Sequence, residues 1–115
     1  MASTPKQMKA TGYLPNSVAV AYLCGGGVTG SAKQATVKMM VLCNTDTVPN
    51  TVTVYNVPSG GTVGGSTTVF SAYTLQAGET QRIAMADTLL YGDAIQWFAG
   101  AASKVTGSIS GIEYT

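Results

Sequence analysis

Residues able to carry out catalytic chemistry are few in this sequence, and their spacing sets up no recognisable site. The 115 residues include no histidine, the side chain that most often serves as a general base near neutral pH. None of the five acidic residues has the spacing of a glycosidase carboxylate pair or of a calcium-binding loop. These acidic residues are Asp46, Glu79, Asp87, Asp93 and Glu113. We therefore expect no enzymatic activity and no catalytic residue.

The cysteines and a glycine triplet offer two further kinds of chemistry, metal or redox binding and phosphate binding. Cys24 and Cys43 lack the spacing of a CxxC motif, and a zinc site is not expected without histidine. We expect two small buried side chains, with a disulfide between adjacent strands as the alternative. The run from Gly25 to Gly27 lacks the Lys and the Ser or Thr of a phosphate-binding loop, so a flexible or bulged turn is expected. No cofactor or metal is therefore expected.

Aromatic and basic side chains could bind sugars or anions. Aromatic residues make up 8% of the chain, but no segment sets two or three of them on one exposed face. A carbohydrate-binding or adhesion module is therefore kept as an alternative hypothesis. A net charge of +1 gives no general attraction for nucleic acid or for an anionic membrane. Lys6 and Lys9, near the N-terminus, are interpreted as a tether toward an acidic partner surface.

Charged residues are unusually scarce. They make up 10% of the chain, against about 25% in typical soluble proteins, while apolar residues make up 45% and the mean hydropathy is +0.21. Such a surface is typical of a subunit covered by its neighbours, and a Thr-rich domain kept soluble by hydroxyl groups is the alternative. No apolar run is long enough for a membrane helix, and the first residues lack the apolar core of a signal peptide. We therefore expect no membrane partner.

The elements that must position these residues are β-strands. The central stretch runs from Ala35 to Gly61 and contains two predicted strands, Val37 to Cys43 and Thr51 to Val57, as a hairpin-like pair around a polar turn. Five further strands are predicted over residues 17–23, 67–75, 79–85, 93–101 and 104–114. Residues 86–91 are expected to form one helical turn or a crossing loop.

Seven strands without a convincing helix predict an all-β fold, a single β-sandwich over residues 17–115. An immunoglobulin-like arrangement is favoured, with a jelly roll as the alternative. Residues 1–16 are expected to form an extended N-terminal arm that lies across a neighbouring molecule. Trp97 is expected at the centre of the core. In the central strand, the internal positions are predicted to be Val37, Met39, Val41 and Cys43.

Three segments carry a resemblance to a known group of proteins. They read MMVLCNTDTVPNTVTVYNVPSGG, TVFSAYTLQAGET and LLYGDAIQWFAGAASKVTGSISGIEYT. This pattern, over residues 35–115, resembles small structural proteins of tailed bacteriophages and prophages. The resemblance implies a virion β-sandwich that decorates or cements the head, or belongs to the collar, neck or tail, and it implies no catalytic residues. Residues 1–34 lie outside it.

Together these observations predict a non-enzymatic virion structural protein, assembled in the host cytoplasm. We expect it to bind other copies of itself and a larger capsid, neck or tail protein, without a nucleic-acid or small-molecule partner. The alternatives are a carbohydrate-binding or adhesion module at a phage tail and a free-standing cytoplasmic protein with an immunoglobulin-like fold. The candidate partner-interface residues are Lys6, Lys9, Tyr13, Met40, Leu42 and Val57.

Overall fold

The computed structural model of the chain describes residues 3–25 and 33–114, and these form eight strands and one short 3-10 helix. The strands are β1 (Ser3–Tyr13), β2 (Ala19–Leu23), β3 (Gln34–Asn44), β4 (Asn50–Val57), β5 (Thr68–Leu75), β6 (Thr80–Leu90), β7 (Ala94–Ala99) and β8 (Val105–Tyr114), with the 3-10 helix η1 (Gly65–Thr67) before β5. No helix in this described part is long and apolar enough to cross a membrane. The all-β prediction is confirmed.

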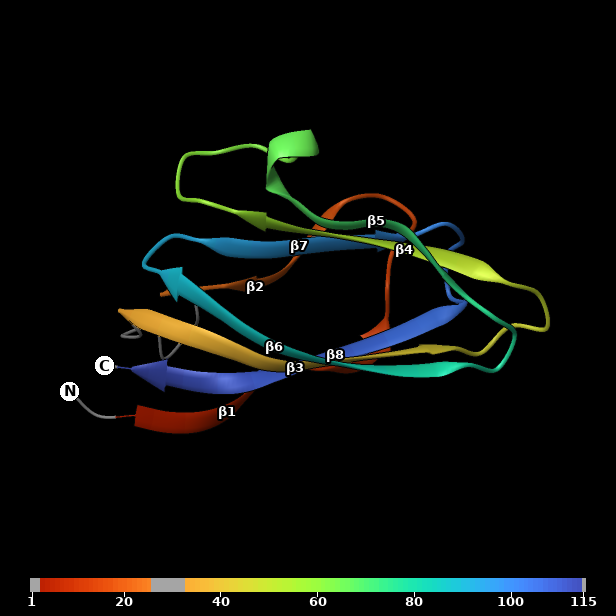
Figure 1. Cartoon of the computed structure of the whole chain (residues 1–115), viewed down its shortest axis with the longest axis horizontal. Helices are drawn as coiled ribbons and strands as arrows, with labels where there is room; N and C mark the ends of the chain where they lie inside the picture. Colours follow the sequence, from red (N-terminus) through yellow and green to blue (C-terminus); the bar gives the residue numbers. More distant parts are fainter. Residues whose placement is uncertain (1–2, 26–32, 115) are drawn as a thin grey trace.

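The strands form two four-stranded sheets that lie face to face (Figure 1). Sheet A has the order β1-β8-β3-β6, and sheet B has the order β2-β7-β4-β5. Antiparallel pairing is nested, because β1 pairs with β8, β2 with β7, β3 with β6 and β4 with β5. The first half of the chain, β1 to β4, thus runs antiparallel to the second half, β5 to β8, as in one long hairpin. This hairpin is rolled up so that β8 also pairs with β3, and β7 also pairs with β4.

This nested order is that of a jelly roll. An immunoglobulin-like sandwich places four strands in one sheet and three in the other, and pairs its strands differently. The β-sandwich is therefore confirmed, but the preference for an immunoglobulin-like topology is wrong, and the jelly-roll alternative fits the strand order. Alternation of apolar and polar residues specifies which face of a strand is buried, but it does not specify which strands pair with each other. The sequence therefore could not distinguish the immunoglobulin-like topology from the jelly roll.

The core lies between the two sheets and is built from residues at alternate strand positions. Trp97 is 2% exposed, as predicted, and the side chains around it are mainly aliphatic. The largest fully buried side chains are Leu14, Val37, Met40, Leu42, Asn44, Val52, Val54, Leu75, Leu89, Ile95, Val105 and Ile109.

The N-terminal segment is part of this sandwich. The sequence predicts an arm over residues 1–16, but Ser3–Tyr13 is an edge strand of sheet A that pairs with β8 from Ser3↔Tyr114 to Tyr13↔Thr106. Its sequence shows no period of two because the register with β8 shifts twice, between Gln7 and Lys9 and between Lys9 and Gly12. The segment is extended, as expected, but it is held within its own molecule.

The predicted hairpin between the two central strands is wrong. β3 belongs to sheet A and β4 to sheet B, so the polar segment between them carries the chain across the sandwich. Residues 86–91 also differ from the prediction, because β6 continues to Leu90, with Leu89 buried opposite Ala35 and Leu90 exposed. The turn predicted over residues 25–27 lies largely outside the described residues.

Val37 is buried, as predicted, but a β-bulge at Lys38 reverses the predicted inner and outer faces of the rest of β3. Lys38 is skipped in the register with both neighbours, β6 and β8, so alternation restarts after it. Met40 and Leu42 are fully buried, while Met39, Val41 and Cys43 are half-buried on the outer face. The prediction that Met40 and Leu42 lie at an interface is therefore wrong, as is the assignment of Met39, Val41 and Cys43 to the core.

Val57, another predicted interface residue, is also buried. It is 3% exposed at the end of β4, opposite Ala94 of β7, which is 6% exposed. A side chain with so little exposed area offers a partner almost no surface, so its assignment as an interface residue is corrected as well.

Candidate partner-binding surfaces

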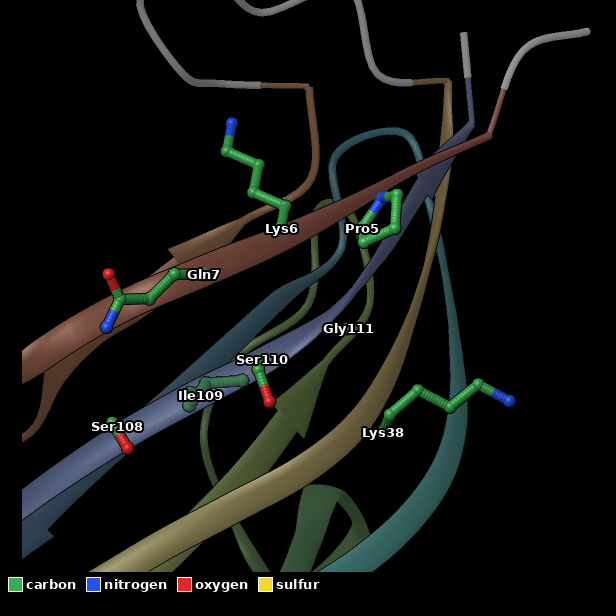
Figure 2. A pocket seen from close by; sticks show the side chains of 8 residues that line it. All are labelled: Pro5, Lys6, Gln7, Lys38, Ser108, Ile109, Ser110 and Gly111. Atoms are coloured by element: carbon green, nitrogen blue, oxygen red, sulfur yellow. The ribbon is translucent and has the colours of Figure 1, made fainter.

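The outer side of sheet A carries a groove of about 650 Å³, referred to below as the sheet A groove. Figure 2 shows Gln7 on one side of β8 and Lys38 on the other, with the side chains of Ser108 and Ser110 between them. Ile109 is fully buried and Gly111 has no side chain, so these two residues form the floor. The lining residues are Pro5, Lys6, Gln7, Lys38, Ser108, Ile109, Ser110 and Gly111.

Irregularities in strand register explain why sheet A is hollowed at this level. On one side of Ser110 the register of β1 skips Met8, and on the other side the register of β3 skips Lys38. The β3–β6 pairing is irregular at the same place. Bulges bend the strands that contain them and increase the local twist, so aligned bulges bend sheet A across its width. Small side chains on β8 at the bend leave the hollow unfilled.

Each polar side chain of the groove can donate hydrogen bonds, the two lysines carry positive charge, and none of the lining residues is acidic. Lys38 is exposed, and the hydroxyl groups of Ser108 and Ser110 lie within the groove. Lys6 is half-buried, and in Figure 2 its side chain extends away from the two serines. Its Nζ lies 3.1 Å from Oε1 of Glu113, so its charge is paired within the molecule.

Glu113 connects the two sheets at this end of the sandwich. Its other carboxylate oxygen accepts a hydrogen bond from the hydroxyl of Tyr22, which lies on β2 of sheet B. Burial, and then the hydrogen bond to Glu113, raise the pKa of Tyr22 above its ordinary value of 10.0. Burial also raises the pKa of the nearby Cys24 thiol. These groups join edge strand β2 to sheet A.

The raised pKa of Tyr22 predicts a loss of stability at alkaline pH. The folded state holds the phenol proton more tightly than the unfolded chain, so this stabilisation is complete below about pH 10 and is lost as the pH rises further, at about 1.4 kcal/mol per pH unit. Tyr22→Phe should remove this slope and, at neutral pH, cost about 1.5–3 kcal/mol because a hydrogen bond to a charged acceptor is lost. Urea unfolding between about pH 9.5 and 11 measures both effects.

Tyr13→Phe is the control for this experiment, because Tyr13 is 58% exposed. It should leave the alkaline slope unchanged. The slope that Cys24 contributes is common to the wild type and both variants, so it cancels in the comparison. Parallel stability curves for wild type and Tyr22→Phe would show that the cross-sheet hydrogen bond does not control alkaline unfolding.

The outer side of sheet B is chemically different and is referred to below as the sheet B face. None of its four strands contains a charged residue, whereas the strands of sheet A contain Lys6, Lys9, Lys38, Arg82, Asp87 and Glu113. Val20 and Leu23 of β2 are 53% and 42% exposed, and Val69 of β5 is 39% exposed. Tyr55 of β4 and Phe98 of β7 stack with their ring centroids 6.4 Å apart. This face is uncharged and partly apolar.

The remaining sequence-predicted interface residues, Lys9 and Tyr13, do not line the sheet A groove, although Lys9 pairs with Ile109 of its floor. Lys9 is exposed on β1, and Tyr13 is exposed at the end of that strand. The most exposed aromatic residues, Tyr13 and Tyr91, lie at opposite ends of sheet A, because Tyr13 pairs with Thr106 while Tyr91 follows Leu90, which pairs with Gln34. They therefore form no common platform for stacking on a sugar.

The cysteines are both free in the structure, with Cys24 buried and Cys43 half-buried. Cys24 Sγ lies 3.8 Å from the carbonyl oxygen of Leu89. Cys24 is buried, as expected. Cys43 is only half-buried, because the bulge at Lys38 places it on the outer face of β3. Within residues 3–25 and 33–114 there is no group of three or more acidic and cysteine side chains that could hold a metal ion.

The fold and these surfaces define a jelly-roll domain with one cationic, grooved face and one uncharged, partly apolar face. No protein-family model matches the sequence, and no curated protein matches it. Among solved structures, the chain is similar to a protein of Bacillus endospore appendages, which form a family of disulfide-linked pili. The two chains are 18% identical, with a TM-score of 0.54, over 98% of this chain and 88% of that one.

A second solved structure is that of infectious bursal disease virus, Gx strain. It is 10% identical, with a TM-score of 0.47, and the similarity covers 97% of this chain but 30% of the viral chain. At these identities the first comparison supports the fold alone, and the TM-score of the second is too low to support more. The function must therefore be inferred from the surfaces themselves.

One feature of the sequence, the position of Lys38, does indicate the groove. Lys38 interrupts an otherwise apolar run, Val37 to Cys43. A long charged residue inside a strand that is apolar on both sides is difficult to place in regular alternation, and a bulge resolves the conflict by directing that residue to the surface. The contribution of β1 and β8 could not be found this way, because their pairing joins opposite ends of the sequence.

Proposed function

We propose that this protein is a non-enzymatic structural subunit that assembles with other copies of itself and with a larger capsid, neck or tail protein of a bacteriophage particle. The observation that carries the proposal is the sheet B face, where four neighbouring strands contain no charged residue. Charges normally keep exposed sheets from associating. A face without them fits a surface that is covered in the assembled state.

The exposed side chains support this role for the sheet B face. Val20 and Leu23 lie on edge strand β2, and Val69 lies on edge strand β5 at the opposite side of the sheet. A stable interface buries about 800 Å² on each partner, with an apolar centre and a polar rim. Apolar residues at both edges, with Tyr55 and Phe98 between them, offer contacts across the full width of the sheet.

Edge strand β1 of sheet A is better protected against pairing with another chain than the two edge strands of sheet B, β2 and β5. β1 carries Pro5, two lysines and two register shifts, features that natural proteins use to block edge pairing. β2 and β5 carry no charge, although each contains one or two register shifts. Self-assembly through sheet B therefore meets fewer obstacles than assembly through β1.

The placement in a phage particle is supported by the sequence resemblance to small virion proteins over residues 35–115. In this proposal the chain assembles in the host cytoplasm and remains in the virion. The most exposed aromatic residues, Tyr13 and Tyr91, form no common platform for a sugar, and a glycan array tests the carbohydrate-binding alternative directly.

Substitution of Val20 provides the sharpest test of self-assembly. Val20→Lys should raise the dissociation constant of the assembly by more than about tenfold, because an unpaired ammonium group is buried at the interface. Val48→Lys is the matched control, since Val48 is also 53% exposed but lies in the loop between β3 and β4. Light scattering after size exclusion, over a range of protein concentrations, gives the mass of each variant.

A wild-type chain that stays monomeric at millimolar concentration would contradict self-assembly, as would equal behaviour of the two lysine variants. Assembly with a larger protein needs a second experiment. Purified particles from a producing host should contain this chain at a fixed stoichiometry, and electron cryomicroscopy should locate a jelly-roll density on their surface. Particles that lack the chain would contradict the placement in a virion.

A further inference from the structure

We propose that the sheet A groove binds an extended acidic segment of the larger partner protein. The proposal rests on the proposed function, because it identifies the surface that meets this partner, while the sheet B face meets other copies. It would assign to Lys38, Ser108 and Ser110 a role in recognising carboxylate groups.

The charge distribution of sheet A favours an acidic partner. Lys38 is exposed at the groove, and Arg82 lies on the outer side because it pairs with Val41, between the buried positions Met40 and Leu42. The two acidic residues in the strands of this sheet take inward positions. Asp87 pairs with buried Val37, and Glu113 reaches Tyr22 of the other sheet. Among the described strand residues of sheet A, the outward charges are therefore positive.

A second copy of this chain is a poor source of the acidic segment, because most of its carboxylates are already bonded within the molecule. Glu113 pairs with Lys6, and Asp93 accepts hydrogen bonds from the amides of Ser59 and Leu90. Glu79 accepts from the amide of Gln76, and Asp46 from the side chain of Asn50. The groove therefore fits a different protein that supplies free carboxylates.

Other classes of ligand fit the groove less well. No lining residue is aromatic, so the groove lacks the stacking surface that sugars and bases use. Lys6 is neutralised by Glu113, which leaves Lys38 as the unpaired cation of the lining. One cation is too little for a polyphosphate chain, whose affinity depends on many neutralised phosphates. It is enough to complement one carboxylate of a peptide.

The spacing of the two serines favours an extended segment. Ser108 and Ser110 are two residues apart on β8, so they lie about 6.6–6.8 Å apart along the strand. Alternate side chains of an extended peptide have the same spacing. Carboxylates at two alternate peptide positions can therefore accept hydrogen bonds from both hydroxyls, and the Lys38 ammonium lies on the side of β3.

The test uses isotope-labelled protein and a synthetic eight-residue peptide in which Glu and Thr alternate. Titration should shift the backbone amide signals of residues 106–111 and 36–39, and the same peptide with Gln in place of Glu should shift them little. Lys38→Glu should weaken binding by more than about tenfold, and Ser110→Val by about threefold. Lys104→Glu is the control, because it makes the same charge change on an exposed residue before β8.

Several results would overturn the proposal. These are equal affinity for the Glu and Gln peptides, shifts centred outside the groove, or equal weakening by Lys38→Glu and Lys104→Glu. Stronger competition by inorganic phosphate or by an acidic glycan than by the peptide would assign the groove to another ligand. Dispersed amide spectra and unchanged unfolding midpoints show that the variants are folded.

Failure of this inference can be separated from failure of the proposed function. Lys38→Glu should leave self-association unchanged and should lower occupancy on particles. Particles that still incorporate Lys38→Glu at full occupancy would overturn the groove as the partner site while leaving the structural role intact. Binding of the acidic peptide by a chain that never assembles and is absent from particles would instead contradict the proposed function.

Discussion

Gly111→Ala is expected to destabilise the fold by about 3–5 kcal/mol, a large part of the 5–15 kcal/mol that holds a typical domain together. Gly111 is buried in β8, where it pairs with Val37 of β3 on one side and Lys6 of β1 on the other. A β-carbon at this position would overlap the backbone carbonyl oxygen of Thr36 and lie 3.0 Å from Sδ of Met8. A backbone group cannot move aside as a flexible side chain can, so the ladder between β3 and β8 must open.

Gly64→Ala is the matched control for this substitution. A β-carbon at Gly64 meets no atom within 4 Å, and the backbone there is extended. Its expected effect is between zero and a gain of about 1 kcal/mol, because alanine restricts the unfolded chain. Urea or thermal unfolding followed by circular dichroism measures both variants. A loss below about 1 kcal/mol for Gly111→Ala would show that sheet A can relax at the bend.

Asn44→Asp is expected to cost about 3–5 kcal/mol although the two side chains have nearly the same shape. Asn44 is fully buried at the end of β3, and its Nδ2 donates to the carbonyl oxygens of Val48, Leu75 and Gln76 at 2.9, 3.1 and 3.2 Å. Its Oδ1 accepts from the amide of Asp46 at 3.0 Å. A carboxylate has no proton to donate and would face three carbonyl oxygens.

The pH dependence of this variant provides a second readout. Burial and the surrounding carbonyl groups raise the pKa of the introduced carboxyl, so the folded variant binds a proton more tightly than its unfolded chain. Its loss of stability should therefore be smaller near about pH 4 than near neutral pH. Asn16→Asp, at an exposed position between β1 and β2, is the control and should change stability by less than about 0.5 kcal/mol. Equal losses for both variants would show that the loop contacts of Asn44 contribute little.

Much of the secondary structure could be predicted from the sequence, because most strands bury one face and alternate accordingly. β4, β5, β7 and β8 lie within about two residues of their predicted positions. β1 was missed because an edge strand with two register shifts does not need alternating residues. The C-terminal part of β6, Ala86 to Leu90, was missed because Thr88 is its only β-branched residue, so its local preference for a strand is weak. Pairing with β3 nevertheless holds this part in the sheet.

The surfaces were harder to predict, for a physical reason that Met40 illustrates. Relative to β8, β3 has one extra residue, which exchanges the inner and outer faces of the residues after it. A prediction without this residue places Met40 and Leu42 on the outer face, although both are fully buried. The small number of charged residues indicated covered surfaces. The sequence did not show that the four uncharged strands form one sheet, because that depends on which strands become neighbours. The hydrogen bonds of buried Asn44 were also missed, because its three acceptors come from two separate parts of the chain: Val48 in the loop between β3 and β4, Leu75 at the end of β5, and Gln76 directly after β5.

The nested pairing of strands has a consequence for how the chain reaches this structure. The turn region between β4 and β5 closes the shortest loop, and each further pair encloses the one before it, ending with β1 and β8. Loop-closure entropy and high contact order make such topologies slow to fold, on the order of milliseconds to seconds. During synthesis β1 has no partner in sheet A until β8 is made. All four uncharged strands of sheet B are therefore made before sheet A is complete. The fold is therefore complete only when β1 and β8, the two ends of the described chain, have paired.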